Sequence, residues 1–62
     1  MIPAELLRIL ATTVFVSNGV GEYTANTNGY TLTIADDILT VHNTTNELIG
    51  QYTMDVIVNS YQ

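Results

Sequence analysis

Regular alternation of apolar and polar residues between positions 30 and 54 is the feature that most constrains this chain. Leu32 and Ile34 alternate with threonine and alanine, and Leu39 and Val41 do the same after a short polar break. A period of two is typical of strands with one buried face. A turn at Asp36-Asp37 would send the apolar residues of both strands to the same face. The sequence therefore predicts an antiparallel hairpin as the centre of the fold.

Two Asn-Gly pairs predict further hairpins on the N-terminal side. Asn-Gly supplies the positive φ that a two-residue type I′ turn requires at both positions. Asn18-Gly19 would join strands over 12–17 and 20–25, and Asn28-Gly29 would join the second of these to the strand that starts at Tyr30. The predicted opposing pairs are Val16 with Gly21, Val14 with Tyr23, Ala25 with Leu32, Tyr23 with Ile34, Ile34 with Leu39, and Leu32 with Val41.

A fourth turn over 44–47 completes a five-stranded meander, with Val41 opposite Gly50 and Leu39 opposite Tyr52. The last strand is expected to run from Gln51 to Val58. The registers predict one apolar face and one polar face. The predicted core face holds Val14, Val16, Tyr23, Ala25, Tyr30, Leu32, Ile34, Leu39, Val41, Leu48, Tyr52 and Met54. The predicted polar face holds a row of Thr13, Thr24, Thr33, Thr40 and Gln51 beside Asn26, Thr31 and His42.

Residues 4–11 are expected to form a short helix that covers the core face. Pro3 suits the first helical position, Glu5 adds an acid to the first turn, and Leu6 and Leu10 share an apolar stripe. A helix this short is marginal unless it is docked. A backward extension of the first strand through Thr12-Thr13 therefore remains an alternative.

The predicted fold class is mainly β (α+β). A helix over 1–11 precedes a meander over 12–58, strongly curled or barrel-like, and a tail over 59–62, all in one small domain over 1–62. The meander leaves apolar edges at Val56, Ile57 and Val58 and at Val14 and Val16. These edges could pair with each other and close a barrel, or pair with a second subunit. These five residues are the candidate interaction site.

Composition limits the partners. The 62 residues have a net charge of -5, Arg8 as the only strong base and no cysteine. Phosphate neutralisation needs clustered lysine and arginine, so we expect no nucleic-acid and no anionic-membrane partner. No disulfide or thiolate site can form, and so small a chain often needs oligomerisation to complete its core. With no membrane span and no signal peptide expected, the prediction is a soluble protein, cytoplasmic or virion-associated.

Few residues suggest chemistry. His42 is the only histidine, and the registers place no acid or serine beside it. Asp36-Asp37 fits turn propensity better than a cation loop, and Asn43-Thr44-Thr45 is a frequent chance match to a glycosylation acceptor. We therefore expect no enzyme activity, no catalytic residue, no metal site and no cofactor.

Two functions follow from these observations. The first is a structural or protein-interaction module that acts as a homo-oligomer or as an accessory subunit, with a viral or phage assembly as one setting. Its partner would be itself or another protein. The alternative is an acidic inhibitor that binds a basic surface of a larger enzyme or nucleic-acid-processing complex, which rests on the charge of -5 alone.

Overall fold

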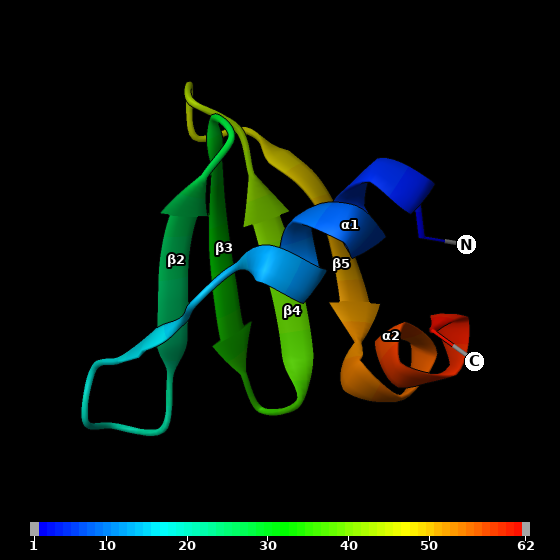
Figure 1. Ribbon diagram of the computed structural model, residues 1–62. Helices are drawn as coiled ribbons and strands as arrows, with labels where there is room; N and C mark the ends of the chain where they lie inside the picture. Colours follow the sequence, from blue (N-terminus) through cyan, green and yellow to red (C-terminus); the bar gives the residue numbers. More distant parts are fainter. Residues whose placement is uncertain (1, 62) are drawn as a thin grey trace.

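The computed structural model describes residues 2–61 and contains a helix, an antiparallel sheet and a second helix (Figure 1). The sheet order follows the chain, β1-β2-β3-β4-β5, so it is a meander. None of the helices within residues 2–61 is long and apolar enough to cross a membrane. The elements are α1 (Ala4–Thr12), β1 (Val16–Ser17), β2 (Tyr23–Thr27), β3 (Tyr30–Ala35), β4 (Ile38–His42), β5 (Leu48–Thr53) and α2 (Met54–Ser60).

The two central hairpins have the predicted registers. Ala25 opposes Leu32, and Leu32 opposes Val41 across the next ladder. Both connecting turns have positive φ at both central residues, 50° and 81° at Asn28-Gly29 and 52° and 62° at Asp36-Asp37. The type I′ turn predicted at Asn28-Gly29 is thus confirmed, and the turn predicted at Asp36-Asp37 has positive φ at both residues as well.

The first hairpin differs from the prediction. Val16 opposes Thr24 instead of Gly21, because the connection is a five-residue loop over 18–22 and β1 has only two residues. The Asn18 backbone N–H donates to the Glu22 carbonyl oxygen at 3.0 Å and closes this loop. The register moves by three residues, an odd number, so every side chain of the first strand changes face.

This change of register decides which side chain of the first strand reaches the core. Val14 and Val16 were expected to be buried, but they are 83% and 65% exposed. Phe15 packs against the core in their place. Thr13 leaves the predicted threonine row as well, and its hydroxyl donates to the Ile9 carbonyl oxygen at 2.6 Å.

A β-bulge changes the faces of two residues at the start of β5, and both stay exposed, Leu48 to 57% and Ile49 to 53%. Val41 opposes Gly50 as predicted, but His42 opposes Leu48, which leaves Ile49 without a partner of its own. Leu48, which was expected in the core, lies beside His42 on the polar face and is exposed. Ile49 instead lines a small hollow on the core side with Pro3 and Leu6.

The largest correction concerns the last segment, which was predicted to be strand through Val58. The strand ends at Thr53, and Met54–Ser60 is helical. Thr53 caps the helix with its side-chain oxygen, which accepts from the Val56 backbone N–H at 3.4 Å, and Asp55 places a negative charge in the first turn. Residues 59 and 60 therefore belong to α2 and not to a tail, and Gln62 lies outside the described residues.

Both helices cover the same face of the sheet, and α1 crosses it in front of β4 and β5 (Figure 1). Helix α1 confirms the predicted helix and excludes the strand alternative. The core joins its Leu6 and Ile9 to Leu32 and Leu39 of the sheet and to Ile57 of α2. The predicted core residue Tyr23 is exposed.

The barrel-like closure was wrong. β1 and β5 are the two outer strands of an open sheet, and β1 pairs only with β2 while β5 pairs only with β4. The helix at Met54–Ser60 removes the strand segment that would have reached β1. The fold thus has two layers, an open sheet and two short helices that cover one face of it.

Replacement of Gly29 by alanine is expected to lower the free energy of unfolding by about 1 to 2 kcal/mol, because a Cβ is forced into positive φ. Gly29 has φ of +81° and Gly19 has φ of +85°, so the backbone strain is matched. Gly19→Ala should cost less, since its loop adjoins a ladder of only two residue pairs that can open locally. Urea denaturation of both variants measures the difference, and equal stability of Gly29→Ala and the unsubstituted chain would contradict the turn assignment.

Candidate interaction surface

An apolar groove remains open between the two helices on the covered face of the sheet. Its volume is about 260 Å³. Among the described residues that line it, no side chain carries a charge, and Tyr61 supplies the only side-chain oxygen. The lining residues are Leu10, Ala11, Phe15, Ile34, Leu39, Met54, Ile57, Val58 and Tyr61. We call this set the apolar groove.

Three parts of the chain build the groove. Ile34 and Leu39 oppose each other in the β3–β4 ladder and form the floor. The last turns of α1 form one wall, and α2 forms the other. The Tyr61 hydroxyl donates to the Leu7 carbonyl oxygen at 2.5 Å, so the end of α2 is tied to α1 across 54 residues of chain. This bond links the two walls of the groove.

The groove stays open because the two helices are too short to cover the whole apolar face of the sheet. The two helices have nine and seven residues, and together they bury Leu6, Ile9 and Ile57. Val58 and Tyr61 lie at the rim and are 53% and 51% exposed. Exposed apolar surface that is continuous with a core is typical of interaction sites.

The structure brings together only part of the predicted interaction site. Val58 and Ile57 both line the groove from α2, and Ile57 is 5% exposed, so Ile57 is a core residue. Val56 is exposed on α2 outside the groove lining. Val14 and Val16 are exposed as well, but they do not line it, and Phe15 between them does. The sequence signal that was missed is the helix start at Thr53-Met54-Asp55. Because of it, residues 56–58 lie on a helix and not at the edge of a strand.

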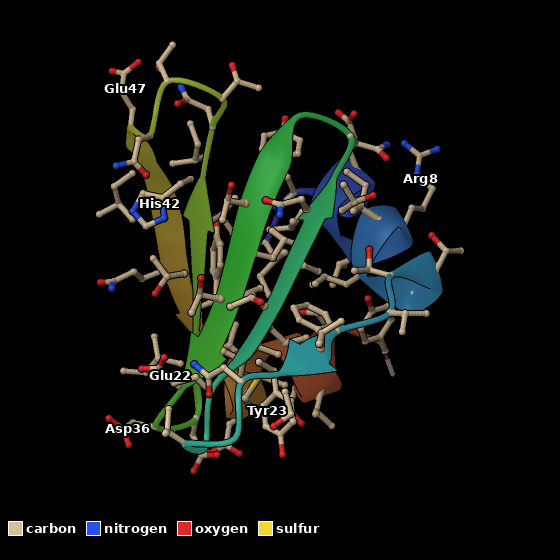
Figure 2. The ribbon with its side chains drawn as sticks, turned by 90° about the vertical axis from the view of Figure 1, so that its left-hand side faces the viewer. Arg8, Glu22, Tyr23, Asp36, His42 and Glu47 are labelled. Atoms are coloured by element: carbon tan, nitrogen blue, oxygen red, sulfur yellow. The ribbon has the colours of Figure 1, made fainter. Side chains whose placement is uncertain are left out.

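The carboxylates of the described residues lie outside the groove lining. Figure 2 shows Glu22, Asp36 and Glu47 on the side of the sheet opposite α1, while Arg8 projects from α1. A separate hollow at the end of the sheet is lined by Asp36, Asp37 and Asp55 together with Ile38, Thr53 and Met54. The sequence did not predict that Asp55 joins the turn acids, because it placed Asp55 within a strand.

Asn43 and His42, the residues that suggested chemistry, have neighbours that give them no catalytic partner. Asn43 was a possible glycosylation acceptor, and its Oδ1 accepts from the backbone N–H groups of Thr45 and Glu47 at 3.0 and 2.9 Å. These bonds order the loop between β4 and β5. His42 opposes Thr31 and Leu48, neither of which can act as a base or as a carboxylate partner. Within residues 2–61 no group of three or more histidine, cysteine, aspartate or glutamate side chains could hold a metal ion.

The threonine row is partly as predicted. Thr24, Thr33, Thr40 and Gln51 oppose one another in successive ladders, and the Gln51 amide Nε2 donates to the Thr40 hydroxyl at 3.4 Å. In the neighbouring row the Thr31 hydroxyl donates to Asn26 Oδ1 at 3.0 Å. Hydroxyl and amide groups that satisfy each other in this way are typical of a solvated sheet face.

Comparison with known proteins adds no relative to this description: no family model, no curated protein and no solved structure matches the chain.

Proposed function

We propose that this chain is a non-enzymatic protein-interaction module that works in an assembly, as a homo-oligomer or as an accessory subunit. The observation that carries the proposal is the apolar groove, which leaves part of the apolar face of the sheet uncovered between α1 and α2. An occupant that filled the groove with apolar side chains would complete the core of the chain. Such burial contributes about 25 cal/mol for each Å² of apolar surface removed from water.

The occupant that we assign to the groove is a second copy of the chain. Two copies with a charge of -5 each repel one another wherever their carboxylates come close. The groove lining is uncharged, and the labelled carboxylates of Figure 2 lie on the far side of the sheet. Pairing through the two helix-bearing faces therefore keeps these labelled carboxylates of the two copies apart and joins apolar surface to apolar surface. Glu5 of α1 and Asp55 of α2 lie on the helices but outside the groove lining.

The small size of the chain supports the same proposal. A domain of this length rarely obtains more than about 3 to 5 kcal/mol from its own core, and the chain has no cysteine for a disulfide. Association that occurs only in the folded state adds stability by mass action. Self-association through the groove would supply what a core of two short helices and one sheet lacks.

Replacement of Val58 by glutamate is expected to abolish self-association. The side chain lies at the groove rim and is half exposed, so the folded monomer tolerates the change, whereas a dimer would bury a carboxylate without a partner. For the unsubstituted chain, sedimentation should show particles larger than the 6.8 kDa monomer as concentration rises, with a melting temperature that rises in parallel. Val58→Glu should sediment as a folded monomer at every concentration.

Val14→Glu is the matched control, because it makes the same substitution at a valine that is exposed and outside the groove. It should associate like the unsubstituted chain. If the unsubstituted chain is a monomer up to millimolar concentration with a constant melting temperature, self-association is excluded. If both glutamate variants lose association equally, the effect comes from charge alone and the groove is not the contact.

The acidic-inhibitor function stays a second candidate because of one observation, the hollow that brings Asp55 to Asp36 and Asp37. A basic protein surface could neutralise three carboxylates there. Binding of that kind weakens steeply as salt is raised, whereas association through the uncharged groove does not.

A further inference from the structure

The two Asn-Gly pairs have the same chemistry but different surroundings. Asn28-Gly29 forms the tight turn between β2 and β3, which pair through five residue pairs. Asn18-Gly19 lies in the five-residue loop between β1 and β2, which pair through two. Both asparagines are exposed to water. One pair is thus held by a long ladder, and the other is held by the shortest ladder of the sheet.

An exposed Asn-Gly pair can deamidate without an enzyme. The backbone nitrogen of glycine attacks the side-chain Cγ of asparagine and loses its proton, the bond from Cγ to Nδ2 breaks, and ammonia leaves. Water then opens the cyclic imide and yields either aspartate or isoaspartate. Glycine favours the attack because it has no Cβ to obstruct the approach or to restrict the backbone.

The attack requires rotation about the Cα–C bond of asparagine, which brings the glycine nitrogen onto Cγ. At Asn28 this rotation would break the turn that sets the register of the central hairpin. At Asn18 it has to release two backbone bonds, the 3.2 Å bond from the Gly19 N–H to the Ser17 hydroxyl and the 3.0 Å bond from the Asn18 N–H to the Glu22 carbonyl oxygen. It also has to release two bonds of the side chain, which accepts from the Val20 N–H at 3.0 Å and donates to Glu22 Oε1 at 2.8 Å, all within one exposed loop. Segments with few contacts open at a low cost in free energy, so the Asn18 loop reaches the reactive geometry more often.

We propose that Asn18 is a site of spontaneous deamidation in the folded chain and that Asn28 is protected by its hairpin. The product has a local consequence. The Asn18 side-chain Nδ2 donates to Glu22 Oε1 at 2.8 Å, and deamidation replaces this donor with a carboxylate. The Val20 N–H keeps its acceptor on residue 18 in the aspartate product. Two carboxylates would then face each other across the loop, and their repulsion opens the β1–β2 pairing.

The first test compares the two sites within one molecule. The folded chain is incubated at neutral pH, and peptide mapping by mass spectrometry follows the conversion of each asparagine to aspartate and isoaspartate. Asn18 should convert about tenfold or more faster than Asn28, since an opening free energy lower by about 1.4 kcal/mol gives that factor. In denaturant the two rates should become similar. Equal rates in the folded chain, or faster conversion of Asn28, would overturn the assignment.

The second test measures the consequence for β1. Asn18→Asp should increase amide hydrogen exchange several-fold at Val16 and Thr24, which oppose each other in the β1–β2 ladder as a hydrogen-bonded pair. Glu22→Gln in the same chain should restore protection because the glutamine amide can donate to the new carboxylate. Unchanged exchange in Asn18→Asp would refute the proposed opening of β1. Failure of Glu22→Gln to restore it would refute repulsion as the cause.

Discussion

Replacement of Ile57 by lysine is expected to unfold the chain. Ile57 is 5% exposed and packs in the core cluster against residues of α1 and the sheet. Loss of a buried isoleucine side chain costs about 2 to 5 kcal/mol, and an ammonium group in the same place adds a desolvation cost. A domain of this size has about 3 to 5 kcal/mol to lose. Far-UV circular dichroism should show an unfolded chain at physiological temperature, and thermal denaturation should show no cooperative unfolding transition.

Val56→Lys is the control, because Val56 is on the same helix and is 43% exposed. It should keep the fold and change the free energy of unfolding by less than about 1 kcal/mol. Comparison of the two variants distinguishes a loss of core packing by α2 from an effect of a new charge on its exposed surface. If Ile57→Lys gives a folded monomer with native-like stability, the placement of Ile57 in the core is wrong, and residues 56–58 return to the role of an exposed edge.

Replacement of Leu32 by alanine is expected to destabilise the chain by about 2 to 5 kcal/mol, with a cavity in the middle of the sheet as the cause. Leu32 is fully buried in the central strand β3, between Ala25 and Val41 of the neighbouring strands. Its neighbours belong to two ladders, so they cannot move into the space without breaking a register. Urea denaturation should show a lower midpoint, or no folded baseline at all.

Leu48→Ala makes the same substitution at a leucine that is 57% exposed as a result of the β-bulge. Its effect should stay within about 1 kcal/mol. The pair therefore tests the bulge as well as the core, because the regular register without a bulge would bury Leu48. A large loss of stability in Leu48→Ala would show that the regular register is the correct one.

Self-association and core stability are linked in this chain. The groove floor is formed by Ile34 and Leu39, and Leu39 is also among the most deeply buried side chains of the core. A second copy that covered the groove would shield this part of the core from water and raise the free energy of unfolding. Measurements of Leu32→Ala and Ile57→Lys should therefore be made at one fixed protein concentration.

The sequence predicted the two central hairpins and the first helix, because in each case a local signal agreed with the hydrophobic pattern. Asn28-Gly29 and Asp36-Asp37 are turn sequences whose two-residue loops leave one register in which both strands bury the same face. Pro3 and the leucine stripe after it predicted α1, which needed only the sheet to dock on.

The register of the first hairpin could not be predicted from local sequence signals. Asn18-Gly19 permits a two-residue turn, but the chain uses a longer loop, and Phe15 instead of Val14 and Val16 packs, partly buried, against the core. Only the core determines which of these residues is buried, because the larger aromatic side chain fills the space beside the helices. The bulge at Ile49 is a similar case, since it lets Ile49 reach the core side at the cost of exposing Leu48.

The candidate site depended most on tertiary structure. Val56, Ile57 and Val58 are β-branched and favour a strand by propensity, and the Thr53 cap and Asp55 are weaker signals for a helix. The helix forms because it buries Ile57 against α1 and the sheet, a contact between residues that are about 50 positions apart. The sequence by itself determined the registers of the two central hairpins and the apolar character of the segments, while the packing of α2 on α1 decided where the apolar groove lies. The physical reason is that turns and alternation act over a few residues, whereas an open core is a property of surfaces that meet only after folding.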